Sequence, residues 1–291
     1  MTTLFNATLA LADRLGVLRH SFATGGSTTT IVDTSRYEGN DEFLGGTAWI
    51  ITDAGGASAA PEAEFAYISD WVLASHTFTI DTVTAAVAAG DRYGFTAARY
   101  PLDVLTNAIN NEIRKYKIEK WDLTSLDIVS AQSEYDLPTG IYKHNLIGVY
   151  ESTNDDADDN MWVPINYRVE QTATGTQDVL VVESQVVGVD NDIGLHYYDW
   201  HDAVYDCDDE IDDLIPLERI ISAAAAHCEL IRMRTYDGES KLDIEMLKYY
   251  RQEAREAASR FPVRYSGKRG NVNEAAGSLQ REARVSVPAR A

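Results

Sequence analysis

Residues 216–231 read PLERIISAAAAHCELI, and this segment has the pattern of a helix. Pro216 is a residue favoured in the first turn of a helix. The apolar side chains then recur at spacings of three and four, at Leu217, Ile221, Ala224, Cys228 and Ile231. The run of four alanines at 223–226 would let a second helix approach closely, and the Asp-Gly pair at 237–238 would end the helix. The stretch therefore predicts a helix whose apolar face needs a partner.

Three more segments, at residues 3–18, 101–116 and 240–261, have the same helical period. In the last one the expected buried face consists of Leu242, Met246, Tyr249, Ala254, Ala257 and Phe261. None of the four helices has an apolar partner within its own neighbourhood. The simplest solution packs the four faces together as a helical bundle. The competing arrangement is two β domains in series, with the helices as independent additions.

The two long stretches between these helices have the texture of strands and turns. The first has β-like runs at residues 28–32, 47–52, 65–72, 77–80 and 92–96. The second has β-like runs at residues 125–130, 145–151, 161–170, 178–183 and 193–200. Insertions of this kind in surface connections are thermodynamically tolerated.

The sequence therefore predicts an α+β fold. Its helical bundle of about four helices is discontinuous and takes residues 1–18, 99–120 and 214–261. The first β insertion takes residues 19–98 and the second takes 121–213. Residues 262–291 are expected to form an extended C-terminal docking arm.

The chain is strongly acidic. Its 291 residues include 46 acidic and 25 basic side chains, a formal net charge of −21. This argues against a body that grips nucleic acid, because phosphate binding needs clustered Lys and Arg. Nucleic acid can still pass nearby, since an acidic wall repels phosphate. No run of 18 apolar residues and no secretory signal pattern is found, so no membrane partner is expected.

Two acidic clusters are conspicuous. The first comprises Asp155, Asp156, Asp158 and Asp159, and the second, before the helix at 216, comprises Asp208, Asp209 and Glu210. Neither fits a calcium loop, because the twelfth positions are Tyr167 and Arg219 instead of Glu. We expect them to form an acidic lumen or flank, and a solvated charge run is the alternative.

Nothing in the sequence indicates an enzyme, a resident metal or a cofactor. No two of the six histidines have the i, i+4 spacing of a helical zinc site. A Gly-x-Ser-x-Gly elbow is absent, and the Gly-Lys pair at 267–268 lacks the lead-in of a phosphate loop. Cys207 and Cys228 are the only cysteines, expected as reduced thiols, with a bridge between them as the alternative.

The second β region ends with an aromatic patch that comprises Tyr197, Tyr198, Trp200 and Tyr205. Aromatic side chains at this density suit the centre of a protein interface. Stacking on a glycan would use the same residues, and the core of a β domain is a third interpretation.

The last thirty residues differ from all the rest. Residues 262–291 carry six basic and two acidic side chains, so the other 261 residues hold a charge of −25. Such a segment has too few apolar residues for a core of its own, so we expect it to order on a partner, and a solvated, disordered tail is the alternative. The arm contacts that we expect are Tyr265, Val272, Leu279, Arg281, Arg284 and Val287.

The layout as a whole resembles a known family. A short helix leads into a Gly/Thr-rich β insertion, followed by YPLDVLTNAIN at residues 100–110 and YDLP at 135–138, a helical hairpin and a trailing arm. This resembles the head-to-tail adaptor (connector) proteins of tailed bacteriophages. The phrase FTI at 78–80 with AVAAGDRY at 86–93 also looks like phage virion sequence.

The resemblance implies a homo-oligomeric ring, usually of twelve copies, seated under the portal protein of the capsid. It implies an arm that docks on the portal, a downstream neck or tail protein as a further partner, and a lumen that passes the genome without specific binding. The protein would then belong to the virion neck, assembled in the host cytoplasm and used in viral DNA ejection. The alternatives are another neck ring, such as a head-closure or tail-terminator protein, and a glycan-binding or hydrolytic β protein.

Overall fold

The structure is a computed structural model that describes residues 2–56, 58–129, 132–152, 162–171, 178–182, 192–235 and 241–263. The chain divides into two compact units. Unit 1 comprises the described residues of Met1–Tyr116 and His201–Arg264, and unit 2 comprises those of Lys117–Trp200. The fold class is α+β, as predicted, with helices in unit 1 and antiparallel sheets in both units.

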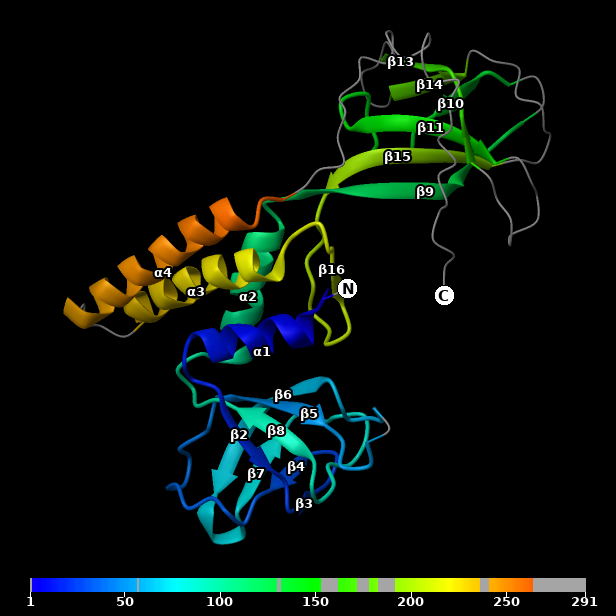
Figure 1. The fold of residues 1–291 in the computed structure, drawn as a ribbon. Helices are drawn as coiled ribbons and strands as arrows, with labels where there is room; N and C mark the ends of the chain where they lie inside the picture. The colour runs from blue at the N-terminus through cyan, green and yellow to red at the C-terminus, as the bar shows by residue number, and fades with distance from the viewer. Residues whose placement is uncertain are drawn as a thin grey trace. The chain divides into compact units, whose positions relative to one another are not determined.

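The helices of the described chain all lie in unit 1 (Figure 1). They are α1 (Leu4–Arg14), α2 (Leu102–Ile113), α3 (Leu217–Thr235) and α4 (Lys241–Arg260). Helix α3 packs against each of the other three. Its small side chains Ala224, Ala225 and Cys228 are fully buried, so the alanine run does allow close approach. Four helices from three separate stretches of sequence therefore share one packing centre.

Helix α1 ends four residues earlier than the periodicity predicts. Gly16 has a φ of +68°, and a left-handed residue of this kind terminates a helix. At the other end Thr3 caps the helix by accepting a hydrogen bond from the Asn6 N–H. The N–H groups of Leu4 and Phe5 donate to carbonyls of the segment at 207–209, at 2.9 and 3.1 Å. The first turn of α1 is thereby fixed to a segment two hundred residues away.

The buried face of α4 matches the prediction only in part. Ala257 is buried as expected, but Leu247 and Tyr250 are buried in place of Met246 and Tyr249, which are exposed. The Tyr250 hydroxyl donates to the backbone of α1, at the Arg14 carbonyl. Leu247 and Tyr250 each follow a predicted position by one residue, which turns the helix by about 100°, so the contact face lies beside the predicted stripe in this part of α4.

A closed β barrel forms the rest of unit 1. Its strands are β2 (Arg19–Phe22), β3 (Gly25–Gly26), β4 (Thr30–Val32), β5 (Thr47–Thr52), β6 (Glu64–Val72), β7 (Thr77–Ile80) and β8 (Arg92–Phe95), with a 3-10 turn at Leu73–Ser75. The sheet order is β2-β8-β5-β6-β7-β4-β3. The residues between β2 and β3 stay bonded to both sides, Ala23 N–H to Asp91 O and Thr24 N–H to Val32 O. The first and last strands are thus one stretch of chain, and the sheet closes on itself.

The barrel interior is dominated by aromatic rings. Phe43, Trp71, Phe78, Tyr93 and Phe95 are all buried, and Phe78 lies 4.4 Å from Trp71 between ring centres. The outer face of β5 and β8 is covered by α1. There the Trp49 Nε1 donates to the Thr8 Oγ1 at 3.1 Å, and both side chains are fully buried. The barrel is therefore joined to the helices through a packed layer.

Unit 2 is built from two small antiparallel sheets. The first has the order β12-β11-β15-β9, with β9 (Lys117–Asp127), β11 (Leu146–Ser152), β12 (Trp162–Pro164) and β15 (Asp192–Trp200). The second has the order β10-β14-β13, with β10 (Glu134–Asp136), β13 (Tyr167–Gln171) and β14 (Asp178–Val182). The two sheets form a sandwich, whose core includes Leu137, Leu180, Ile193 and Leu195.

The strand at 161–170 that the sequence predicts is two strands in different sheets. The break follows Pro164, which cannot donate a ladder hydrogen bond. Strand β9 begins at Lys117, eight residues before the predicted start. The region predicted as a second insertion, 121–213, also differs, because residues 201–213 belong to unit 1. There β16 (Glu210–Ile211) pairs with β1 (Thr2–Thr3).

Within the described parts of the chain, no helix combines the length and apolar character needed to cross a lipid bilayer.

Candidate functional site

Two of the predicted sets of residues lie outside the described residues. These are the six arm contacts, Tyr265, Val272, Leu279, Arg281, Arg284 and Val287, and the first acidic cluster, Asp155, Asp156, Asp158 and Asp159. Both remain predictions from the sequence.

The second acidic cluster is hydrogen-bonded to the start of α1. The Asp209 carboxylate accepts the backbone N–H groups of Tyr205 and Asp206, at 2.6 and 2.9 Å. These hydrogen bonds lower the pKa of Asp209. Its own carbonyl accepts the Leu4 N–H, and Glu210 pairs with Thr3 in the β1–β16 ladder. The side chains of Asp208 and Glu210 remain exposed, so the cluster combines a structural turn with an acidic surface.

The predicted aromatic patch is divided between the two units. Tyr205 lies in unit 1 and is 65% exposed. Tyr197, Tyr198 and Trp200 lie on β15 in unit 2, where Tyr197 packs against the sandwich core. The Tyr198 hydroxyl donates to Glu119, and the ring of Trp200 lies under the Lys117 ammonium at 5.0 Å. The sequence neighbours therefore belong to different surroundings and have different roles.

The sequence did not reveal an aromatic face on the sheet that contains β15. Register pairs His196 with Trp121 and with Gly148, which places their side chains on the face opposite the sandwich core. The rings of Trp121 and His196 stack at 4.2 Å with an interplanar angle of 5°. Tyr150 lies 4.9 Å from Trp121. We call Glu119, Trp121, Tyr150, Trp162 and His196 the aromatic face.

Two glycines make room for these rings. A Cβ atom at Gly194 would come within 2.8 Å of the Trp162 ring. A Cβ atom at Gly148 would meet the Tyr150 ring at 3.0 Å. A glycine opposite a large ring within a strand is the signal from which sequence reasoning could have found this face.

A carboxylate and an imidazole meet at the aromatic face. The Glu119 Oε2 lies 3.2 Å from the His196 Nε2, and both side chains are only 14% and 12% exposed. Burial lowers the pKa of His196, although Glu119 opposes the shift. Burial, assisted by Glu119, raises the pKa of Tyr150. A neutral imidazole held by a carboxylate can exchange a proton, but the stacked Trp121 leaves little of its ring accessible.

Unit 1 has an open groove where the barrel meets the start of α2. It has a volume of about 700 Å³ and is lined mainly by apolar atoms. Tyr67 and Tyr205 line it together with Pro101, Leu102 and Asp103. Tyr67 is more than one-third exposed. We call this feature the Tyr205 groove.

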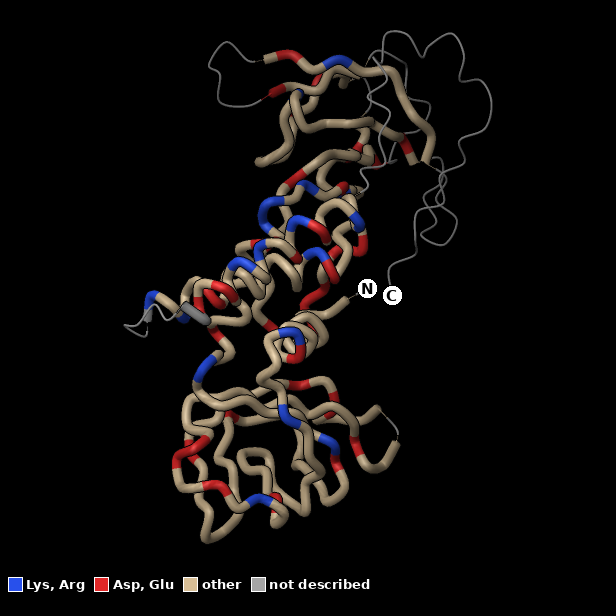
Figure 2. The backbone as a smooth tube through the Cα atoms, turned by 60° about the vertical axis from the view of Figure 1, so that its left-hand side comes forward, with Lys and Arg blue, Asp and Glu red and all other residues tan. Residues whose placement is uncertain are grey.

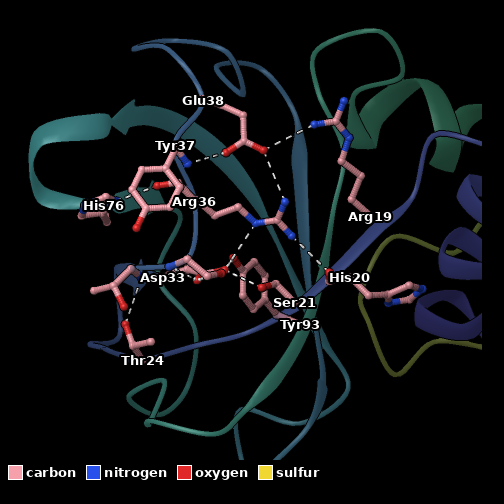
Figure 3. Close-up of polar contacts among 12 residues, drawn as sticks. Arg19, His20, Ser21, Thr24, Asp33, Arg36, Tyr37, Glu38, His76 and Tyr93 are labelled. Carbon is pink, nitrogen blue, oxygen red and sulfur yellow. Dashed lines mark hydrogen bonds and ion pairs between the residues drawn. The ribbon is translucent and has the colours of Figure 1, made fainter.

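Inside the barrel a fully buried carboxylate organises the loop at 33–46 (Figure 3). The Asp33 Oδ2 accepts hydroxyl hydrogen bonds from Ser21 at 2.5 Å and from Tyr93 at 2.7 Å. Its Oδ1 accepts the Ser35 N–H and hydroxyl. The Arg36 Nε lies 3.4 Å from Oδ2, which makes an ion pair rather than an aligned hydrogen bond. Because every lone-pair direction has a donor, this carboxylate is suited to structure and not to proton transfer.

The same network presents an exposed tyrosine. The Arg36 guanidinium lies over the Phe95 ring and donates to the Glu38 carboxylate and to the His20 carbonyl (Figure 3). The neighbouring Tyr37 is 76% exposed, with the His76 ring edge-on to it at 5.5 Å.

Buried charges also tie the helices together. Arg232 on α3 bonds to Glu229 on the same helix and to Asp243 on α4. Tyr100 lies just before the start of α2, and its hydroxyl donates to the Glu229 carboxylate at 2.5 Å. Burial would raise the pKa of Glu229, but the hydrogen bonds from Arg232 and Tyr100 outweigh it, so that pKa is lowered. Figure 2 shows acidic and basic positions interleaved along these helices.

Within the described ranges, no group of three or more His, Cys, Asp or Glu side chains is arranged to hold a metal ion. Cys207 and Cys228 are both free thiols. No protein-family model matches the chain, and no curated protein is similar to it.

Proposed function

We propose that this protein is a structural head-to-tail adaptor of a tailed-phage virion. It forms a ring under the portal, connects capsid to tail and lets DNA pass. The proposal places it in the virion neck, after assembly in the host cytoplasm. It performs no chemistry, and its function resides in the geometry of its interfaces.

The observation that carries the proposal is the discontinuous helical centre of unit 1. Helices α1, α2 and the α3–α4 pair come from three separate stretches of sequence, yet α3 packs on all the others. The barrel and the sandwich occupy the two connections between those stretches. This is the layout that the family resemblance implies, a bundle with elaborated β insertions.

Charge supports the same function. The chain outside residues 262–291 carries −25, and the exposed Asp208 and Glu210 belong to that acidic surface. A channel with acidic walls lets DNA slide without adhering, because the carboxylates repel the phosphates of the DNA. The basic arm offers the opposite charge to a protein neighbour.

The arm provides the test. Deleting residues 266–291 should leave a folded protein that no longer joins portal-bearing heads. Joining would be measured by co-sedimentation of the protein with purified heads. A matched variant, with Arg281, Arg284 and Arg290 replaced by Gln, keeps the length of the arm and removes half of its six cations. Joining by the truncated protein at the level of the full chain would contradict the proposal.

A second ring position in the neck fits the same architecture. A head-closure or tail-terminator protein would also be an acidic ring, but its arm would not touch the portal. Crosslinking of the arm in intact particles, followed by identification of the crosslinked protein, separates the two positions.

The aromatic face favours one function of a different class, glycan binding by unit 2. Trp121, Tyr150 and the Glu119 carboxylate are the residue types that bind sugars, although the stacking of Trp121 on His196 covers one of its ring faces. Binding of the full chain on a glycan array, abolished by Trp121→Ala, would favour this function over the adaptor.

A further inference from the structure

We propose that the Tyr205 groove binds the C-terminal tip of this protein, residues 284–291. The tip reads RVSVPARA. Both the groove and its occupant belong to this chain, so the inference does not depend on the adaptor function. It assigns Arg284 and Val287 to a copy of this chain and leaves the other four expected arm contacts for the portal.

The groove has the surface of a peptide-binding site. Tyr205 and Tyr67 present two rings at its wall, and Pro101 and Leu102 add further apolar surface. The Tyr205 side chain is 65% exposed although its backbone is fixed, since its N–H donates to Asp209. A tyrosine held in this way loses little conformational freedom when a ligand packs on it. An aromatic groove of this type is suited to an extended, proline-containing segment.

The tip supplies the matching chemistry. Val285, Val287 and Pro288 are its apolar side chains, and Arg284 and Arg290 are its cations. Proline fixes its own φ and disfavours helix at the residue before it, so the sequence of the tip suits an extended ligand. Extended chains of this kind pack their prolines between aromatic rings.

Charge favours the tip over an acidic partner. Asp103 lines the groove and is exposed, and the Asp209 carboxylate lies at the backbone of Tyr205. The basic residue nearest to Asp103 in the sequence is Arg99. Its guanidinium lies over the Tyr100 ring, 5.7 Å from the ring centre. An arginine of the tip would find a carboxylate at the groove wall.

The connecting chain is long enough. The described chain ends at Val263 in unit 1, and residues 264–283 separate it from the tip. Twenty residues can span up to about 70 Å, more than the roughly 30 Å diameter of a small domain. The tip can therefore reach the groove of its own copy or that of an adjacent copy.

Photo-crosslinking of the full chain tests the proposal. A p-benzoyl-phenylalanine at position 287 or 289 would be irradiated in the purified protein, without portal, and the crosslinked peptides identified by mass spectrometry. We expect crosslinks to the residues that line the groove, which are Gly45, Tyr67 and the segments at 98–107 and 203–207. Mixing isotope-labelled with unlabelled copies shows whether the tip binds its own groove or that of a neighbour, and both outcomes support the site.

Groove variants make the test specific. Tyr205→Ala and Asp103→Lys should each lower the yield of these crosslinks at least fivefold, since each removes a wall contact or reverses the charge. Tyr37→Ala, at a more exposed tyrosine of unit 1, should leave the yield unchanged. Circular dichroism verifies that each variant is folded. Crosslinks that map elsewhere, that form only when portal is added, or that survive Tyr205→Ala would overturn the proposal, and the portal-dependent result would leave the adaptor function standing.

Discussion

The barrel of unit 1 and the sandwich of unit 2 place their aromatic rings on opposite sides of their sheets. In the barrel, Trp71, Phe78 and Phe95 fill the interior. In the sandwich, Trp121 and Tyr150 contact each other on the outer face, and the core is mainly aliphatic. The barrel also closes its sheet through β2 and β3, whereas β9 and β12 are edge strands of the four-stranded sheet.

This difference separates two uses of the same residue types. Aromatic rings inside a closed barrel contribute to stability, because their whole surface leaves water. On the aromatic face Trp162 is buried, but Trp121 and Tyr150 are only partly buried and remain able to contact a partner. The barrel rings therefore contribute mainly to stability, and the aromatic face offers a surface for contacts.

Removing a barrel ring should have the largest effect. Phe78→Ala deletes a ring that contacts Phe43, Trp71, Tyr93 and Phe95, and we expect a loss of about 3–5 kcal/mol. Trp121→Ala on the aromatic face should cost about 1–2 kcal/mol, since less surface is buried. Hydrogen exchange measured by mass spectrometry reports each unit separately. Equal losses for the two variants would show that the ring of Trp121 stabilises its unit as much as a ring of the barrel interior does.

The Asp33 network should come next. Asp33→Ala leaves the donors of Ser21, Ser35 and Tyr93 without their acceptor, and we expect a loss of about 3 kcal/mol in urea unfolding. Glu42→Ala, at an exposed position of the same loop, serves as the control and should change stability by less than about 0.5 kcal/mol.

The Asp33 network should also make the stability of the protein depend on pH. Burial would raise the pKa of Asp33, but the hydrogen bonds from Ser21, Ser35 and Tyr93 outweigh it and lower that pKa. The stabilisation is therefore complete above the ordinary value of about 3.9 and is lost as the pH falls through the lower, folded value. The melting temperature of the wild type should decrease more steeply below pH 4 than that of Asp33→Asn. Parallel curves would contradict the assignment.

A smaller effect is expected from the glycine beneath Trp162. In Gly194→Ala the new Cβ would lie 2.8 Å from the ring, and the required shift should cost about 1–3 kcal/mol in unit 2 alone. Gly39→Ala, where nothing lies within 4 Å of the new atom, is the matched control. Protection from hydrogen exchange should fall in the sandwich and not in the barrel. A neutral Gly194→Ala would show that Trp162 is free to move.

The smallest effect concerns His196. Burial lowers its pKa in the folded protein, so the unfolded chain binds a proton more readily below its ordinary value of about 6.5. Stability should therefore decrease as the pH falls from 7 to 5, and His196→Gln should flatten that slope in unit 2. His144→Gln, at an exposed histidine of the same unit, should not change it. If the stability of His196→Gln changes with pH as steeply as that of the wild type, the His196 imidazole is not the cause of the pH dependence.

The sequence predicted the parts of this fold that depend on local periodicity. The apolar spacing in α3 and the alternation in Thr77–Ile80 can be seen within the elements themselves. The barrel closure could not be predicted, because Arg19–Phe22 and Gly25–Gly26 have no apolar alternation and are ordered by partner strands. The aromatic face depends on the register between β9, β11 and β15, which brings together Trp121, Tyr150 and His196 from far apart in the chain.

Ring formation on the portal can be measured by native mass spectrometry, from the mass of the purified protein alone and with portal protein. The adaptor account predicts that the full chain forms a closed ring on the portal and that the chain lacking residues 266–291 does not. A full chain that stays monomeric with and without portal, or a truncated chain that forms the same complex, would contradict it.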